Sequence, residues 1–481
     1  MSSLVILTMT GIVSAQTYDG YTLYGKMGNN KVYLIDMSKA IYHTWSTNNQ
    51  TGYSVYLLPN KHILRSVQYM GNQLQGPGMC GMVQDLDWDG TVTWQYLYSN
   101  SSYCSHHDIH AMPNGNVLLI AYEVKSAAEV VAAGGAQSMT MWPDKIVEIQ
   151  PQGSNGGTVV WEWHVWDHLV QDHDASKNNY DVVADHPELI DINYQQQKEW
   201  LHVNGIDYNE TLDQIVISSH TYSEIYVIDH STTTAEAAGH TGGNSGKGGD
   251  ILYRWGNPAV YNTGNTSNQV FKVVHDAHWV PEDCPRAGYL VGFNNQKLSG
   301  NKSSVDIINP PYDGYNYSIT PGTAFTPTTV TWRHSCRQSS QDQSNSQQFP
   351  NGNMLICIAA SGYIYEIDSS QNLLWSFTAG GTVAKAYRYT YEYVTGIDNG
   401  NISTESFRVY PNPTTGKVIL SGTSLENTSF RITVFNMNGK LVMSSENEST
   451  ADLTNLNNGI YFLTVQTGKS EFYHKKIILI K

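Results

Sequence analysis

The segment Phe349-Pro350-Asn351-Gly352-Asn353-Met354-Leu355-Ile356 continues through Gly362-Tyr363-Ile364-Tyr365-Glu366-Ile367-Asp368 and then reaches Trp375. Its Asn-Gly pair predicts a type I′ hairpin turn between two strands. Apolar residues then alternate with polar ones, as in a third strand, and a polar turn leads into a fourth strand that ends at the tryptophan. The segment therefore predicts four antiparallel strands connected in order.

The same unit recurs along the chain, most clearly at residues 112–120. The tryptophans that end the fourth strand of each unit are Trp45, Trp94, Trp161, Trp255, Trp332 and Trp375. Repeated four-stranded units of roughly 40–50 residues indicate propeller blades, each of which covers the apolar face of its neighbour. We therefore predict an all-β fold, with a six-bladed β-propeller over residues 16–396 whose first blade is completed by residues 386–391. Two separate β-sandwiches are the alternative.

The composition agrees with an all-β protein. Charged residues make up 14% of the chain, against roughly 25% in an average soluble domain. Aromatic residues reach 11% and there are 41 glycines, a mixture that excludes a disordered chain and argues against a helical bundle or coiled coil. The net charge of −15 argues against nucleic acid as a partner, because a phosphate backbone is bound by a basic surface.

The N-terminus has the pattern of an export signal. The apolar run from Leu4 to Val13 is followed by Ser14-Ala15, so residues 1–15 are the predicted signal peptide. A buried strand is the alternative. No later segment reaches about 18 apolar residues, and no integral membrane segment is expected. The five cysteines permit one or two disulfides, but their spacing does not pair them.

Residues 397–405 are polar and are the predicted linker to a C-terminal module, residues 406–481. The module resembles the C-terminal sorting domain of the type IX secretion pathway. The residues that carry this resemblance are Val409-Tyr410-Pro411-Asn412-Pro413, Val434-Phe435-Asn436-Met437-Asn438-Gly439, Leu453 and Asn458-Gly459-Ile460-Tyr461. The resemblance implies a small Ig-like β-sandwich, the secretion machinery as a partner, and release from the cell or attachment to its surface.

Histidines are clustered before three of the predicted hairpins, in His106-His107-Asp108-Ile109-His110, His202-Val203-Asn204 and His275-Asp276-Ala277-His278. The first strand of each blade lines the central channel, so these groups are expected to converge at one mouth of it. Alternation along the strand would turn His110 and His278 away. Converging imidazoles bind anions and offer a nucleophile. Three histidines and an aspartate also suit zinc or iron, but the ligands would have to come from different blades, and we expect no metal and no cofactor.

Residues 20–393 also resemble the arylsulfate sulfotransferases, which are propellers. The motifs that carry this resemblance are His107-Asp108 with Pro113-Asn114-Gly115, His202-Val203-Asn204-Gly205 with Ser218-Ser219, Leu252-Tyr253-Arg254-Trp255-Gly256, His275-Asp276-Ala277 with Gly292-Phe293, and Ala386-Tyr387-Arg388-Tyr389. The resemblance implies transfer of a sulfuryl group from an aryl sulfate to a phenol through a sulfohistidine at His275. It implies that His107 and His202 hold the sulfate or act as acid and base, and that Asn204 donates an amide hydrogen bond to it.

The chain departs from the family where an arginine follows Ser-Ser, since His220 stands there. An arginine gives a fixed cation with a bidentate grip on the sulfate, and a neutral histidine does not. We expect His220 and Arg388 to bind the substrate, with Arg333 and Lys385 as other candidate cations. The alternatives are a non-catalytic surface propeller that binds carbohydrate or protein and, after it, a quinone-dependent dehydrogenase.

Overall fold

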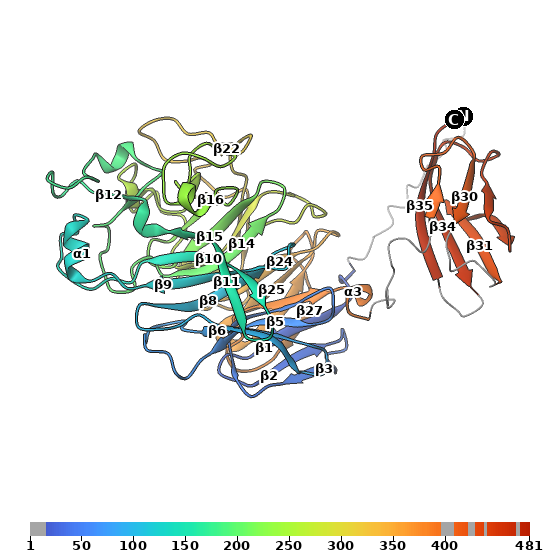
Figure 1. The fold of residues 1–481 in the computed structure, drawn as a ribbon, viewed down its shortest axis with the longest axis horizontal. Helices are drawn as coiled ribbons and strands as arrows, with labels where there is room; N and C mark the ends of the chain where they lie inside the picture. Colours follow the sequence, from blue (N-terminus) through green and yellow to red (C-terminus); the bar gives the residue numbers. More distant parts are fainter. Residues whose placement is uncertain (1–15, 396–407, 422–428, 437–439, 468–471) are drawn as a thin grey trace, which may run out of the picture. The chain divides into compact units, whose positions relative to one another are not determined.

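The computed structural model describes residues 16–395, 408–421, 429–436, 440–467 and 472–481. It divides into two compact units, the first ending at Val394 and the second beginning at Thr395 (Figure 1). The predicted signal peptide, residues 1–15, and the predicted linker, residues 397–405, lie outside the described residues. No described helix is long and apolar enough to cross a membrane.

The first unit contains six four-stranded antiparallel sheets, numbered here in chain order. Sheet 1 is β28 (Ala386–Tyr389), β1 (Tyr21–Gly25), β2 (Lys31–Ile35) and β3 (Ile41–Ser46). Sheet 2 is β4 (Gln50–Leu57), β5 (Ile63–Gln68), β6 (Gly81–Leu86) and β7 (Val92–Leu97). Sheet 3 is β8 (Tyr103–Ala111), β9 (Val117–Glu123), β10 (Asp144–Gln152) and β11 (Gly156–His164).

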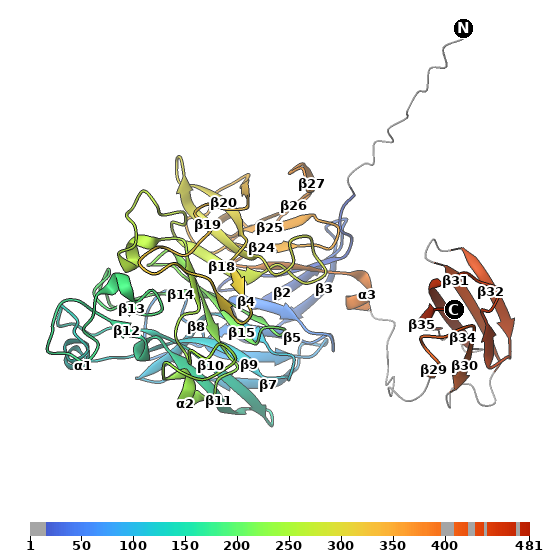
Figure 2. The same ribbon diagram turned by 90° about the horizontal axis from the view of Figure 1, so that it is seen from above.

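Sheets 4 to 6 repeat this order of strands. Sheet 4 is β14 (Val203–Asn209), β15 (Gln214–Ser219), β16 (Glu224–Asp229) and β17 (Tyr253–Trp255). Sheet 5 is β18 (Val274–Trp279), β19 (Leu290–Leu298), β20 (Lys302–Ile308) and β23 (Trp332–Ser335). Sheet 6 is β24 (Asn345–Gln348), β25 (Met354–Ile358), β26 (Tyr363–Ile367) and β27 (Leu373–Thr378). Figure 2 shows the inner strands β4, β8 and β18 near the middle of the unit, with β7, β11 and β27 toward its rim.

Short elements connect these sheets. The helices are α1 (Ala127–Ala132), α2 (Thr234–Ala237) and α3 (Tyr391–Thr395). The 3₁₀ helices are η1 (Val165–Asp167), η2 (Val183–Asp185), η3 (Pro258–Tyr261) and η4 (Ala359–Ser361). The two-stranded sheets are β12 (Leu169–Val170) with β13 (Ile190–Asp191), and β21 (Tyr312–Asp313) with β22 (Asn316–Tyr317). The largest insertion therefore lies between sheets 3 and 4.

The first unit closes on itself through β28. Although it follows sheet 6 in the chain, β28 pairs with β1 and places Arg388 opposite Thr22, so it completes sheet 1 as the sequence analysis expects. The six marker tryptophans all lie in the fourth strands of their sheets. The indole N–H of Trp94 donates to Gly156 in sheet 3, and those of Trp45, Trp161 and Trp255 donate to loops that connect strands of the next sheet. The indole of Trp375 in sheet 6 donates to the Met37 carbonyl beside sheet 1.

The hairpin turns differ from the predicted type I′. In a type I′ turn both central residues have positive φ. Only the glycines do so here, Gly115 and Gly352, each at φ 85°. Asn114 instead accepts a hydrogen bond from the Asn116 backbone N–H through its side-chain oxygen, at 2.9 Å. The turn is therefore one residue longer than predicted, with the glycine in the left-handed position that other residues avoid.

All five cysteines are buried free thiols, so the permitted disulfides do not form in this structure. The described residues of the second unit form two sheets, β29-β30-β33 and β32-β31-β34-β35. Its strands are β29 (Arg408–Tyr410), β30 (Lys417–Ser421), β31 (Phe430–Asn436), β32 (Leu441–Glu446), β33 (Thr450–Asp452), β34 (Gly459–Thr467) and β35 (Phe472–Leu479). Leu420, Val434 and Leu463, one from each of three strands, meet in one apolar core.

Candidate active site

The inner strands carry irregularities at the predicted histidines. Strand β8 has a bulge between Ser105 and Ile109, and His107 within it has φ 51°. Strand β18 has a bulge between His275 and His278, and His202, just before β14, has φ 54°. Bulges re-aim side chains, and positive φ is uncommon for residues other than glycine. The three sheets thus turn these imidazoles out of the regular strand pattern.

The predicted histidines lie in one continuous file of rings, named here the histidine file. Ring centroids of His107 and His202 are 4.8 Å apart, those of His202 and His220 are 4.7 Å apart, and those of His220 and His275 are 5.7 Å apart. Sheets 3, 4 and 5 therefore bring four imidazoles together, including that of His220.

The tautomer of His275 follows from its partner. Its Nδ1 lies 2.8 Å from Asn295 Oδ1, while the Asn295 amide nitrogen donates to the Ser340 and Gln343 carbonyls. A carbonyl oxygen only accepts, so Nδ1 of His275 carries the proton and Nε2 carries the lone pair. Burial, followed by the neighbouring His220, lowers the pKa of His275 to about 3. The ring is neutral at physiological pH, as a nucleophile requires.

His107 occupies the deep end of the file and is buried. Its Nδ1 lies 2.8 Å from Nδ1 of His106, and its Nε2 lies 3.3 Å from Nε2 of His202. A neutral imidazole has one donor and one acceptor, so a proton received at one end of this series is released at the other. Burial holds the pKa of His107 well below its usual value, and burial lowers that of His202 to about 3.

Asp144 stands behind this series. Its Oδ1 lies 3.1 Å from Nε2 of His106 without hydrogen-bond geometry, and it accepts a hydrogen bond from the Val203 backbone N–H at 3.0 Å. Burial raises the pKa of Asp144 to about 8. Asp144 could not be predicted from the inner-strand motifs, because it lies in β10, the third strand of its sheet and two strands outside β8.

His220 is the most accessible member of the file, with 29% of its side chain exposed. Its Nε2 lies 3.2 Å from Asp342 Oδ1. Burial raises the pKa of Asp342 and the hydrogen bond to His220 lowers it. The hydrogen bond has the larger effect, so the pKa of Asp342 is lowered. The file therefore opens to solvent beside His220 and Asp342.

Lys385 is the cation nearest the two aspartates that follow the catalytic candidates. Its Nζ lies 2.6 Å from Asp108 Oδ2 and 2.9 Å from Asp276 Oδ1, with all three side chains buried. Asp108 and Asp276 directly follow His107 and His275 in the sequence. Lys385 therefore ties together sheets 3 and 5 and is neutralised by two carboxylates, so it is a positioning group for the histidines.

The structure does not bring Arg388 to the histidine file. Its guanidinium is buried against the Glu366 carboxylate and donates to Thr22 Oγ1 at 3.0 Å, which connects sheets 6 and 1. The expected sulfate contact of Arg388 is replaced by this ion pair. Arg333 likewise pairs with Asp306, at 2.6 Å, within sheet 5.

Asn204 is buried between sheets rather than presented to a ligand. Its amide nitrogen donates to the Val274 carbonyl at 2.9 Å, and its oxygen accepts from Ser218 Oγ at 2.6 Å. The first bond joins β14 to β18, and the second joins β14 to β15 within sheet 4. Asn204 therefore does not present its amide to a ligand, contrary to the expectation. It instead sets the spacing of the strands that carry or follow His202 and His275.

Two cavities lie beside these groups, one next to His107 and the other next to Lys385. One of about 270 Å³ is lined by Tyr53, Tyr69, Met27, Met79 and Gly78, and the ring of Tyr53 lies 5.1 Å from that of His107. A Cβ on Gly78 would come within about 2.0 Å of the His107 ring, so this glycine lets the loop cover the histidine.

The other cavity, of about 820 Å³, is lined by His110, His278, Lys385, Trp279 and Tyr387 among others. Three features therefore follow one another along β8 and β18. The histidine file comes first, Asp108 and Asp276 with their shared Lys385 come next, and this cavity comes last. His110 and His278 line this cavity rather than the file, but the bulges in β8 and β18 mean that the alternation of a regular strand is not the cause.

The first unit thus defines an all-β protein with an imidazole-lined site where its sheets meet. Residues 42–371 match the arylsulfotransferase (ASST) family, and the chain belongs to that family. Residues 408–481 match the secretion system C-terminal sorting domain, so the second unit links the protein to the type IX secretion machinery, and the protein is exported to the cell surface or the medium.

No curated protein matches the chain. Among solved structures, a Bacteroides caccae protein of unknown function is similar with 12% identity and a TM-score of 0.44, over 76% of this chain and 98% of that one. The periplasmic gluconolactonase PpgL of Pseudomonas aeruginosa has 10% identity and a TM-score of 0.38, over 76% of this chain and 98% of that one.

Proposed function

We propose that the first unit is a six-bladed propeller that moves a sulfuryl group from an aryl sulfate to a phenol, with His275 as the nucleophile. Membership of the arylsulfotransferase family supports the reaction class. The observation that carries the assignment of His275 is its bond to Asn295, which leaves an unprotonated Nε2 on a neutral ring. The pairing of β28 with β1, which completes sheet 1, supports the six-bladed ring.

In the first half-reaction Nε2 of His275 attacks the sulfur. The N–S bond forms while the S–O bond to the aryl oxygen breaks, and the electron pair leaves on the phenolate. Charge spreads over the sulfuryl oxygens, so positioned N–H donors lower the barrier, as they do in phosphoryl transfer. In this step an N–H of the His107–His202 pair donates to a sulfuryl or phenolate oxygen.

In the second half-reaction the oxygen of a phenol attacks the same sulfur. The N–S bond breaks and the lone pair returns to Nε2 of His275. The phenol gives its proton to the His107–His202 pair, which passes it to solvent or to the released phenolate. Tyr53, Tyr69 and the methionines of the neighbouring cavity offer an apolar surface for an aryl ring.

His220 takes the part that the arginine has in the family. Its ring lies between those of His202 and His275, and its Nε2 contacts Asp342. A protonated His220 would supply a cation, but without the bidentate geometry of an arginine. We therefore propose that this enzyme holds the sulfate less tightly, which raises KM for the donor.

The experiment is incubation of the purified chain with 4-nitrophenyl sulfate and phenol. We expect release of 4-nitrophenol that depends on the phenol, and loss of that release in His275→Ala. His110→Ala is the matched control, because His110 lies in the same strand as His107 but lines the opposite cavity. Absence of turnover in the wild type, or equal turnover in His275→Ala, would overturn the proposal in favour of a binding propeller.

A further inference from the structure

A second cluster of potential ligands lies away from the histidine file, in the insertion between sheets 3 and 4 and the loop after α2. It consists of His168, His240 and Asp250, whose ligand atoms all lie within 4.8 Å of one another. His168 Nδ1 is 3.0 Å from Asp250 Oδ1, and His240 Nδ1 is 2.7 Å from the same oxygen. We propose that these three side chains bind a zinc ion.

The first argument is the protonation of His168. Its Nε2 lies 2.9 Å from the Ala237 carbonyl, which only accepts, so Nε2 carries a proton. In a neutral ring Nδ1 then presents a lone pair to the Asp250 carboxylate. Two acceptors at 3.0 Å repel each other unless a positive charge stands between them. A metal ion bound to both atoms supplies that charge.

The second argument is the support around His168. Metal-ligating histidines almost always donate their other N–H to a carbonyl or carboxylate, which fixes the ring and the lone pair. His168 does this through Ala237, and its ring is stacked on Trp163 at 10° between planes. Trp163 in turn donates to the Gly249 carbonyl at 2.7 Å. The ring is thus oriented by contacts that leave Nδ1 facing Asp250.

The loop that carries the other two ligands is shaped to approach this ring. A Cβ on Gly249 would lie about 2.0 Å from the Ala237 carbonyl oxygen and 2.7 Å from Nε2 of His168. Only glycine permits the close approach at this place. The adjacent Asp250 is therefore held beside His168, and His240 reaches the same carboxylate from the start of the loop.

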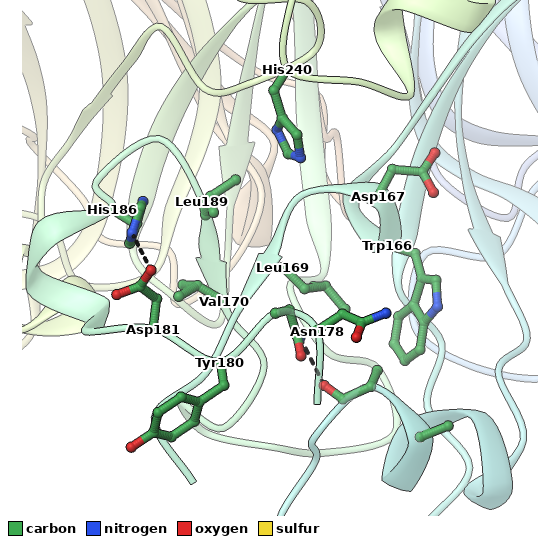
Figure 3. A pocket seen from close by; sticks show the side chains of 13 residues that line it. Trp166, Asp167, Leu169, Val170, Asn178, Tyr180, Asp181, His186, Leu189 and His240 are labelled. Carbon is green, nitrogen blue, oxygen red and sulfur yellow. Dashed lines mark hydrogen bonds and ion pairs between the residues drawn. The ribbon is translucent and has the colours of Figure 1, made fainter. Parts of the chain in front are cut away.

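The ligand set favours zinc. Two imidazoles and one carboxylate with a free fourth position are a common zinc arrangement, with bonds of about 2.0–2.2 Å. Of the three side chains, His240 also lines a cavity of about 430 Å³, together with Trp166, Asp181, His186 and Tyr180 among others (Figure 3). Water or a small anion would complete the coordination. Asp250 is 82 residues from His168 and 10 from His240 in the sequence, so local spacing does not reveal the site.

The test is calorimetric titration of zinc chloride into the full chain after treatment with a chelator. We expect one saturable site per chain, with at least about tenfold weaker binding in His240→Ala and in Asp250→Asn. His240 has 61% of its side chain exposed, so its replacement does not threaten folding. His186→Ala, which lines the same cavity outside the triad, is the control and should bind zinc as the wild type does.

Cobalt provides a second readout that does not depend on enzyme activity. The wild type loaded with Co²⁺ should show the visible absorption bands of a low-symmetry site, and His240→Ala should lose them. Absence of saturable zinc binding would overturn the proposal and leave a proton between His168 and Asp250. Equal zinc affinity in the wild type and His240→Ala would overturn it as well.

Discussion

The Asn295 side chain faces Nδ1 of His275 with its oxygen, because its amide nitrogen is held by two backbone carbonyls. Asn295 lies in β19, so a neighbouring strand of the same sheet orients the proposed nucleophile. This contact fixes both the tautomer and the direction of Nε2.

Replacing Asn295 tests this orientation. In Asn295→Leu the ring loses its acceptor and is free to change tautomer, so we expect kcat to fall by about a hundredfold, as for other small displacements of a reacting group. KM for the donor should change little. The measurement is steady-state release of 4-nitrophenol, and a kcat within threefold of the wild type would contradict the proposed role.

Asn295→Asp should act through charge instead. A carboxylate beside Nδ1 stabilises the imidazolium and raises the pKa of His275 from its value of about 3. Since the neutral ring is the nucleophile, the acidic limb of the kcat/KM profile should move to higher pH than in the wild type. A profile that keeps the wild-type limb would show that His275 does not titrate in this reaction.

The depressed pKa of His275 also predicts a pH-dependent stability. The ring is neutral in the folded protein above about pH 3, whereas the unfolded chain takes up a proton below about pH 6.5. Stability attributable to this group is therefore complete above pH 6.5 and is lost as the pH falls toward 3, by about 1.4 kcal/mol per pH unit.

The variant His275→Gln should remove this contribution. Between pH 7.5 and 5.0 the free energy of unfolding should fall in both proteins. We expect the fall to be about 2 kcal/mol smaller in His275→Gln than in the wild type. All 12 tryptophans precede residue 396, so chemical denaturation followed by fluorescence reports on the first unit. Parallel losses in the two proteins would mean that the histidine is not kept neutral by the fold.

Replacement of Lys385 should lower the free energy of unfolding by a definite amount. In Lys385→Met the carboxylates of Asp108 and Asp276 remain buried without their shared cation. Removing one partner of a buried ion pair costs about 3–5 kcal/mol, and we expect a loss of that size in urea denaturation.

Lys177→Met is the matched control for this change, because its pair with Asp174 is longer, at 3.8 Å, and partly exposed. Its effect should stay within about 0.5 kcal/mol. If Lys385→Met cost no more than Lys177→Met, the lysine would not be needed to hold the two aspartates together.

The repeat that defines the sheets could be predicted because its signals are local. Each marker tryptophan falls in a fourth strand, and the histidines that precede the hairpins lie together beside the first strands of sheets 3, 4 and 5. Asn295 and Asp342 could not be found in this way, since their partners lie 20 and 122 residues away in the sequence. Arg388 was expected to bind sulfate because sequence position does not reveal that Glu366 occupies its guanidinium.

The tryptophan that links the last sheet to the first gives the final prediction. Trp375→Phe keeps an aromatic ring but removes the N–H that donates to the Met37 carbonyl at 2.9 Å. A lost hydrogen bond to a backbone carbonyl costs about 1–2 kcal/mol. Because Trp375 is at the closure of the ring, we also expect faster amide exchange in β1 and β28, measured by mass spectrometry. Trp332→Phe, at the equivalent place in sheet 5 with a partly exposed ring, is the control and should leave exchange in β1 unchanged. Equal protection of β1 in Trp375→Phe and the wild type would mean that pairing with β28 alone closes the ring.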